Sequence, residues 1–203
     1  MPKPNYLVPK WPKMAFHVED GKLVRDDRRQ RVNNFYKVSE KQYLKDFKKI
    51  FESFPHHPNQ YEEIKLPERA TKYSAGYDIF IPFNLMIEPG ETITIPTGIK
   101  MQMDHDRFLM IVPRSGLGFK YQLGLANTVG IIDSDYYNNE DNEGHILVKL
   151  VNYGKKQIWI DKGEAFCQGI LMSYDICMDD APVNELYERK GGIGSTDNKE
   201  KSV

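Results

Sequence analysis

Hydrophobic residues follow one spacing before residue 60 and another after it. Over residues 40–53 they recur at intervals of three and four, which predicts an amphipathic helix ended by the prolines at 55 and 58. Ser39-Glu40-Lys41-Gln42 reads as a capping box, in which Ser39 caps the helix and Gln42 reaches back. We expect the aromatic face of this helix to pack on the body of the same protein. The hydrophobic positions are Leu44, Phe47, Phe51 and Phe54.

From Ile64 onward, short apolar runs are separated by turn residues. Glu88-Pro89-Gly90-Glu91 and Asp161-Lys162-Gly163-Glu164 are two such turns. A short helical turn is expected over 117–123. The pattern favours a β-sandwich or barrel over alternating strands and helices. The expected strands cover 77–82, 92–95, 108–112, 146–152, 157–160 and 166–173, and a further apolar strand over 129–132 runs into a polar hairpin.

The two ends of the chain differ from this central part. Over residues 1–35, the prolines at 2, 4, 9 and 12 and the charged run 25–31 disfavour regular structure. After Glu188 the chain is Gly-rich and polar, which is typical of a flexible arm. We therefore predict a basic N-terminal extension over 1–60, a β domain over 61–187 and a C-terminal arm over 188–203.

Composition excludes several classes of function. The net charge of −1 combines 13 Lys and Arg against 7 Asp and Glu in residues 1–60 with 15 against 22 in the remainder. Neither balance predicts a nucleic-acid partner or an anionic membrane surface. No apolar run approaches the roughly 20 residues of a membrane helix. Cys167 and Cys177 form no CxxC pair, which fits a reducing compartment, so we expect a cytoplasmic protein.

Five short motifs occur in a fixed order over the last two-thirds of the chain. Together they resemble the trimeric dUTPases, which hydrolyse dUTP to dUMP and pyrophosphate. The resemblance implies an all-β, distorted jelly-roll subunit and a homotrimer with active sites shared between subunits. It also implies Mg²⁺-dependent attack of water on the α-phosphate. The motifs are Ala75-Gly76-Tyr77-Asp78, Pro113-Arg114-Ser115-Gly116, Val129-Gly130-Ile131-Ile132-Asp133-Ser134-Asp135-Tyr136, Gly163-Glu164-Ala165-Phe166-Cys167-Gln168 and Gly191-Gly192-Ile193-Gly194-Ser195-Thr196.

The resemblance makes Asp133 the general base that activates the attacking water. Phosphoanhydride hydrolysis needs a water that is both deprotonated and held in line with the leaving group, and one carboxylate can do both. Taken alone, an Asp at a hairpin tip is usually only a turn former. Asp135 should face the same way, and the match to the family pattern selects Asp133 over it.

The same hairpin is expected to recognise the nucleoside. Backbone groups of Gly130, Ile131 and Ile132 would read the uracil, with Gly130 allowing close approach. By resemblance, Asn127 adds a side-chain contact to the uracil. Tyr136 would pack its ring on the deoxyribose and leave no room for a 2'-hydroxyl; ordinary strand packing is the alternative for this Tyr.

The phosphate-binding residues are predicted by resemblance. The family pattern assigns Arg114, Ser115, Gly116 and Gln168 to the triphosphate, for which Arg supplies a rigid pair of donors. Asp78 supports this group by orienting the water shell of the metal or an arginine of the arm. The C-terminal arm would close over the substrate through Arg189, Ile193, Gly194 and Ser195.

No protein side chain is expected to bind Mg²⁺ directly, because this ion is often held by phosphates and waters. The five histidines are scattered, and none is given a catalytic role.

The chain departs from the family pattern at three places. Ile193 stands where an aromatic residue usually stacks on the uracil. Arg189 lies one residue closer to the glycine pair than usual, so either Arg189 reaches the phosphates through a shifted backbone or Lys190 shares this role. The polar segment 137–144 is longer than the common hairpin, which predicts a surface loop. A protein partner bound through this segment or through residues 1–60 is an open alternative.

Two rival functions follow from the residues. A dCTP deaminase would share the fold but need a Glu placed for deamination, and Asp133-Ser134-Asp135-Tyr136 argues against it. A binding or regulatory protein on a dUTPase-like scaffold would have no need of Asp133.

Overall fold

The computed structural model describes residues 32–51 and 61–180, the two single residues Arg189 and Gly191, and the backbone of 16–19 and 22–25. The chain divides into two compact units, Met1–Arg31 and Val32–Val203. No helix within the described residues is long and apolar enough to cross a membrane.

The first unit contains an antiparallel hairpin of β1 (Phe16–Glu19) and β2 (Lys22–Arg25). The expectation that residues 1–35 lack regular structure is wrong for this segment, while the four prolines lie outside the described residues. Phe-His-Val-Glu alternates apolar and polar residues with the period of a strand, and the intervening Asp20-Gly21 is a pair favoured in two-residue hairpin turns. These local signals outweigh the neighbouring prolines and charges.

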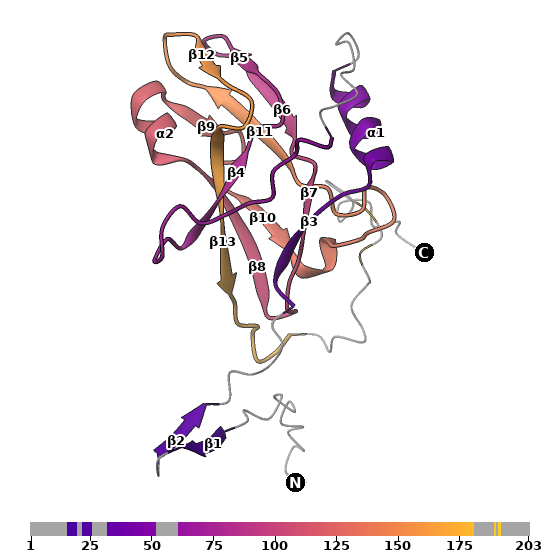
Figure 1. Ribbon diagram of the computed structural model, residues 1–203, viewed down its shortest axis with the longest axis vertical. Helices are drawn as coiled ribbons and strands as arrows, with labels where there is room; N and C mark the ends of the chain where they lie inside the picture. Colours follow the sequence, from indigo (N-terminus) through magenta and orange to yellow (C-terminus); the bar gives the residue numbers. More distant parts are fainter. Residues whose placement is uncertain are drawn as a thin grey trace. The chain divides into compact units, whose positions relative to one another are not determined.

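The second unit is built from short antiparallel strands, as the all-β prediction requires (Figure 1). Two of the predicted turns join them, with Gly90 and Gly163 at φ values of 78° and 81°, where glycine is favoured. The strands are β3 (Asn34–Lys37), β4 (Gly76–Phe80), β5 (Leu85–Ile87), β6 (Thr92–Pro96), β7 (Ile99–Gln102), β8 (Arg107–Pro113), β9 (Leu123–Leu125), β10 (Gly130–Asp133), β11 (Leu147–Asn152), β12 (Ile158–Ile160) and β13 (Ala165–Ser173).

The described strands of this unit form four sheets. The largest has the order β10-β8-β13-β4, and a second has the order β6-β11-β9. β12 pairs with β5, and β3 pairs with β7. Buried residues alternate along the strands, as in β8, where Leu109 and Ile111 are buried while their neighbours are partly exposed. The buried side chains of these sheets merge into one hydrophobic core.

Helix α1 (Glu40–Ile50) begins where the sequence predicts and ends three residues earlier. The Ser39 side chain accepts a hydrogen bond from the Gln42 N–H at 3.1 Å, so the predicted cap is present. The return half of the capping box is wrong, because the Ser39 N–H donates to Glu143 Oε2 at 2.8 Å and not to Gln42, whose side-chain amide donates to Asp46 at 2.8 Å. Phe51 has left helical geometry with φ −121° and ψ 66°, and residues 52–53 lie outside the described residues.

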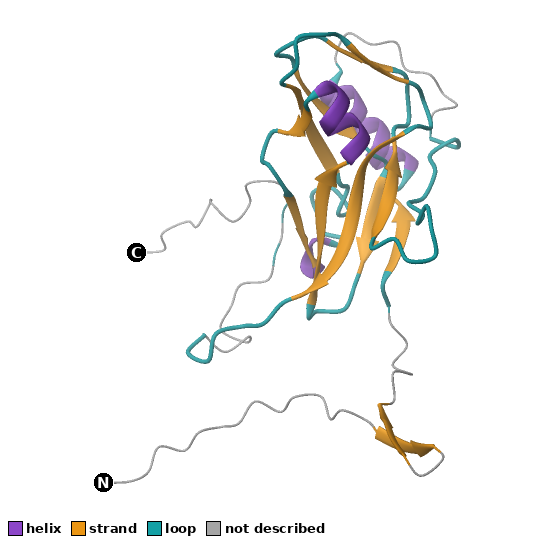
Figure 2. Ribbon diagram, turned by 90° about the vertical axis from the view of Figure 1, so that its left-hand side faces the viewer, coloured by secondary structure: helices purple, strands orange, loops and turns teal. Residues whose placement is uncertain are grey.

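The aromatic face of α1 packs on the body of the protein, as expected. Tyr43 and Phe47 are buried in the core, and the Phe47 ring meets Phe83 edge-on at a centroid distance of 5.6 Å. Helix α1 lies beside β6, and the short α2 (Ser115–Tyr121) lies on the opposite side of the strands (Figures 1 and 2). The helical turn predicted over 117–123 corresponds to α2.

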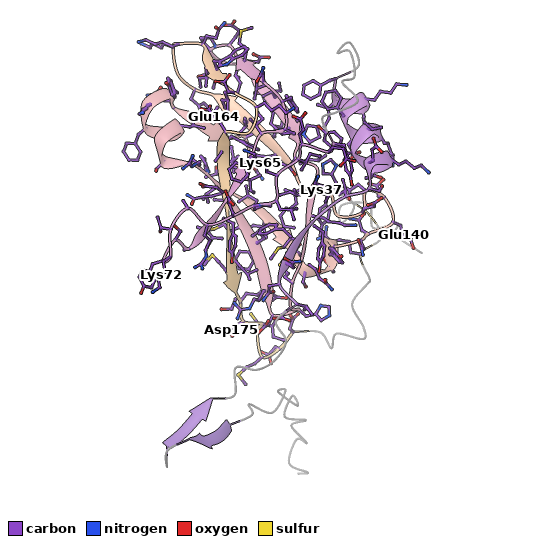
Figure 3. The ribbon with its side chains drawn as sticks, in the orientation of Figure 1. Lys37, Lys65, Lys72, Glu140, Glu164 and Asp175 are labelled. Carbon is purple, nitrogen blue, oxygen red and sulfur yellow. The ribbon has the colours of Figure 1, made fainter. Side chains whose placement is uncertain are left out.

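Segment 137–144, called loop 137–144 below, is a surface loop, as the sequence predicts, but several of its residues are buried. Asn139 and Asn142 are buried, and each satisfies the other's polar groups, with the Asn139 amide donating to the Asn142 oxygen at 2.9 Å. Gly144 has φ 79°, and a Cβ there would lie 2.5 Å from the Tyr136 carbonyl oxygen. Glu140, labelled in Figure 3, marks the exposed edge of this loop near α1.

His145 joins the end of this loop to α1. Its ring is fully buried, its Nδ1 lies 2.6 Å from Asp46 Oδ2, and its Nε2 accepts a hydrogen bond from the Gly98 N–H at 2.8 Å. Because Nε2 is an acceptor, Nδ1 carries the proton and donates to the Asp46 carboxylate. Breaking such a buried hydrogen bond would leave a polar group unpaired at a cost of about 1–3 kcal/mol.

Asp46 and Glu143 both join α1 and its cap to residues 143–145, and their carboxylates make the stability of the fold sensitive to acid. Burial alone would raise the pKa of Asp46, but hydrogen bonds from His145 and Gln42 outweigh it and lower the pKa. For Glu143, hydrogen bonds from Ser39 and Lys100 likewise lower the pKa against the effect of burial. A folded-state pKa below the unfolded one stabilises the fold above the unfolded value, and that stabilisation is lost as the pH falls through the folded value.

We therefore expect the unfolding temperature to drop below about pH 4, where free carboxyl groups take up protons. The measurement is thermal unfolding followed by circular dichroism at successive pH values, with the double variant Asp46→Asn, Glu143→Gln beside the wild type. The variant should lose less stability between neutral and acid pH. Parallel curves for the two proteins would show that other groups cause the acid sensitivity.

Candidate active site

A cleft of about 460 Å³ gathers most of the residues predicted to recognise the nucleoside. It lies where β10 leaves the edge of the four-stranded sheet and continues into a single 3₁₀ turn, η1 (Ser134–Tyr136). Leu125 of β9 and Lys149 of β11 also line it. The predicted site residues among its lining are Asn127, Gly130, Ile131, Ile132, Asp133, Tyr136 and Arg189.

Tyr136 is held firmly at the wall of this cleft. Its side chain is only 6% exposed. Its hydroxyl donates to the His145 carbonyl at 3.1 Å and accepts from the Asn142 amide at 2.7 Å. Burial raises the pKa of the phenol above its ordinary value, so the ring is uncharged at neutral pH.

The structure gives a reason for glycine at position 130 that the sequence alone did not show. A Cβ at this position would lie 3.2 Å from the Cβ of Ile111, its partner across β10 and β8. The glycine therefore lets these strands approach closely. The predicted approach of a base to this position stays a prediction.

Asp133 and Asp135 both face the same guanidinium group. Arg189 donates to Asp133 Oδ2 at 2.7 Å and to Asp135 Oδ1 at 2.9 Å. Its guanidinium carbon also lies 5.7 Å from the centre of the Tyr136 ring. The two carboxylates are about half exposed, while the Arg189 side chain is largely buried. In this state, Arg189 occupies the space in front of both carboxylates and over the ring.

The residues predicted to bind phosphates form a separate group. Arg114 Nε lies 3.3 Å from Asp78 Oδ1, and Gln168 of β13 stands opposite Asp78 of β4. A Cβ on Gly76 would lie 2.2 Å from the Gln168 side-chain oxygen, so that glycine makes room for Gln168. A Cβ on Gly116 would meet no atom within 4 Å, which leaves its backbone open to a ligand.

The two groups lie at opposite ends of β8. Asp133 pairs with Phe108 near the start of this strand, and Arg114 directly follows its last residue, Pro113. Arg114 is six positions after Phe108, so at about 3.3 Å per residue the two ends are roughly 20 Å apart. The fold of one chain therefore separates the predicted base from the predicted phosphate-binding residues.

The remaining predicted residues, Ile193, Gly194 and Ser195, lie outside the described residues. No group of three or more His, Cys, Asp or Glu side chains in the described part of the chain is placed to hold a metal ion. The sequence also did not reveal that Arg189 pairs with Asp133.

Comparison with known proteins decides the family. A family model described as dUTPase matches residues 62–197. The chain belongs to the dUTPase family. The deoxyuridine 5'-triphosphate nucleotidohydrolase of Lactococcus lactis subsp. lactis (strain IL1403) is 43% identical over 133 residues, which cover 66% of this chain and 88% of that dUTPase. The protein of the same name from Rickettsia felis is 37% identical over 135 residues, which cover 64% and 87%.

Solved dUTPase structures share the fold, which confirms the predicted jelly-roll type. The dUTPase from Streptococcus mutans aligns with a TM-score of 0.55 and 30% identity, over 71% of this chain and 98% of that one. A dUTPase mutant from phage phi11 of S. aureus aligns with a TM-score of 0.51 and 20% identity, over 60% and 92%. The family match begins at residue 62, so β3 and α1 precede it.

Proposed function

We propose that this chain hydrolyses dUTP to dUMP and pyrophosphate, which limits uracil in DNA and supplies dUMP for thymidylate synthesis. The single observation that carries the proposal is the cleft in which Asp133 stands beside Asn127, Gly130 and Tyr136, in a chain of the dUTPase family. A half-exposed carboxylate next to a nucleoside-sized cleft can reach both a water molecule and a bound nucleotide.

Asp133 acts as the general base. Its carboxylate accepts a proton from a water molecule and holds that water in line with the bond between the α- and β-phosphates. Arg189 donates a hydrogen bond to Oδ2 of this carboxylate in the free protein, so its guanidinium competes with the attacking water for that oxygen. The triphosphate supplies a competing anionic partner for Arg189, which fits its predicted role as a phosphate ligand.

Uracil and deoxyribose occupy the cleft. Backbone groups of residues 130–132 pair with the uracil edge, and Asn127 adds its side chain. The Tyr136 ring packs on the deoxyribose, and an added 2'-hydroxyl would meet a ring that is fixed by two hydrogen bonds. Arg189 lies over this ring in the free protein, so binding of the sugar displaces it.

The phosphates are bound by Arg114, Ser115, Gly116 and Gln168 of another subunit. The roughly 20 Å between the two ends of β8 keeps these residues away from Asp133 of the same chain. A complete site therefore requires two chains, and a closed ring of three is the assembly that we propose. The arm residues Ile193, Gly194 and Ser195 close over the bound nucleotide.

Mg²⁺ is the cofactor that we propose. Asp78, held beside Arg114, can accept hydrogen bonds from the waters of an ion that the phosphates bind. When bound, the ion neutralises charge on the phosphates during hydrolysis.

A cytoplasmic location is part of the same proposal, because Cys167 and Cys177 are free thiols here and would remain so in a reducing compartment.

Hydrolysis in water enriched in oxygen-18 tests the site of attack. We expect the label in dUMP, because water attacks the α-phosphate and its oxygen stays on that phosphorus. Mass spectrometry of the two products reads the result. Label in pyrophosphate would mean attack on the β-phosphate, and the proposed placement of Asp133 would then be wrong.

A further inference from the structure

We propose that α1 positions the active site: through Asp46 and His145 it holds loop 137–144, and so fixes Tyr136 and the discrimination against ribonucleotides. Asp46 and His145 are positioning residues, since neither lines the cleft. The inference rests on the proposed function, in which the Tyr136 ring packs on the deoxyribose.

Selection against ribonucleotides depends on the position of the Tyr136 ring. A ring excludes a 2'-hydroxyl only if it cannot shift, because a small displacement makes room for one oxygen atom. Both partners of its hydroxyl, the Asn142 amide and the His145 carbonyl, come from loop 137–144 or the residue that follows it. The Asn139 amide also donates to the Tyr136 backbone carbonyl at 2.8 Å. The loop therefore sets the position of the ring.

Contacts with α1 hold loop 137–144 in place. The loop is polar, and Asn138, Glu143 and Gly144 all have positive φ values. Three residue pairs join it and His145 to Ser39, which caps α1, and to the first two turns of the helix. The Ser39 N–H and hydroxyl donate to the Glu143 carboxylate at 2.8 and 2.5 Å. Lys45 donates to the Asp141 carbonyl at 3.0 Å, and His145 donates to Asp46.

The hydrogen bond between Asp46 and His145 has a different role from the apolar packing of α1. The aromatic face of α1 already attaches the helix to the core, through contacts such as that of Phe47 with Phe83. Asp46 is 7% exposed and adds a carboxylate that needs hydrogen-bond donors, whereas an apolar residue would fill such a place without them. Its direct hydrogen bond with His145, 99 residues away, fixes the end of the loop beside Tyr136.

The position of α1 in the chain supports the same view. Residues 39–46 precede the family match, which starts at residue 62. The helix therefore adds support to Tyr136 from outside the matched domain, next to a loop that is longer than the common hairpin.

The test is the ratio of kcat/KM for dUTP to kcat/KM for UTP, measured on the full chain together with the unfolding temperature. Asp46→Ala leaves the buried His145 Nδ1–H without its acceptor, and we expect the ratio to fall about tenfold or more, mainly through better use of UTP. Asp46→Asn keeps an oxygen acceptor for His145 and should retain the ratio. Phe47→Leu loosens the aromatic face and should lower the unfolding temperature without changing the ratio.

An unchanged ratio in folded Asp46→Ala would overturn the inference, and so would an equal loss of discrimination in Phe47→Leu. Tyr136→Phe covers the case in which Asp46→Ala does not fold, since it removes the hydroxyl at the other end of the same network and keeps the ring. A normal ratio in Tyr136→Phe would then overturn it. A wild type that hydrolyses no dUTP would instead overturn the proposed function.

Discussion

Asp133→Asn is expected to lower kcat for dUTP by about 10²–10⁴-fold, the usual contribution of a general base. The amide cannot accept the proton of the attacking water, so the loss should appear in kcat rather than in KM. The fold should persist, because the Asp133 side chain is 51% exposed and its ion pair with Arg189 is a surface contact. Steady-state kinetics measures kcat and KM, circular dichroism reports on the fold, and calorimetry measures dUTP binding.

Asp135→Asn is the matched control. Asp135 pairs with the same guanidinium, at 2.9 Å instead of 2.7 Å, and has a similar exposure. Any effect of merely releasing Arg189 should therefore appear in both variants. We expect Asp135→Asn to keep most of the turnover. If it lost as much activity as Asp133→Asn, the base could not be assigned to Asp133.

Mixing two inactive variants is expected to restore activity. Asp133→Asn removes the base, and Arg114→Gln removes a phosphate ligand at the other end of β8. In a mixed trimer, some sites receive Asp133 from one chain and Arg114 from the other. With random assembly from equal amounts, about a quarter of all sites should be intact, which corresponds to about one site in three within each mixed trimer, because each site needs wild-type contributions from two chains.

The experiment uses two affinity tags, joint refolding or co-expression, and dUTP turnover of the doubly selected assemblies. A chain carrying both substitutions, mixed with Asp133→Asn, is the control, since no site in that mixture can contain Asp133. Recovery in the first mixture alone supports shared sites. Mixed assemblies without activity would mean that each site is built within one chain, against the separation of the two groups.

Local signals explain which parts of the fold could be predicted. The start of α1 follows from Ser39, whose side chain caps the helix whatever the rest of the chain does. The turns at Gly90 and Gly163 follow from residues within the turns themselves. Strand β3 was missed because its four residues carry little pattern, and Phe35 becomes buried only in the folded chain, where it pairs with Met101 of β7 and packs against Tyr77.

The site shows the same division. Asp133, Arg114 and Tyr136 could be selected because the family motifs are contiguous in sequence. The support behind them could not, because His145 and Asp46 are 99 residues apart and become partners only in the folded chain. Asn139 and Asn142 look like surface residues, since Asn is mostly exposed, and they are buried here through hydrogen bonds with each other and with Tyr136.

Hydrolysis of dUTP is tested most directly by incubating the purified chain and Mg²⁺ with dUTP, dCTP, dTTP and UTP in turn. The products are separated by chromatography. We predict dUMP and pyrophosphate from dUTP and little product from the other three. Deamination of dCTP would assign the chain to the rival enzyme class. Binding of dUTP without turnover would contradict the account and leave a binding or regulatory protein.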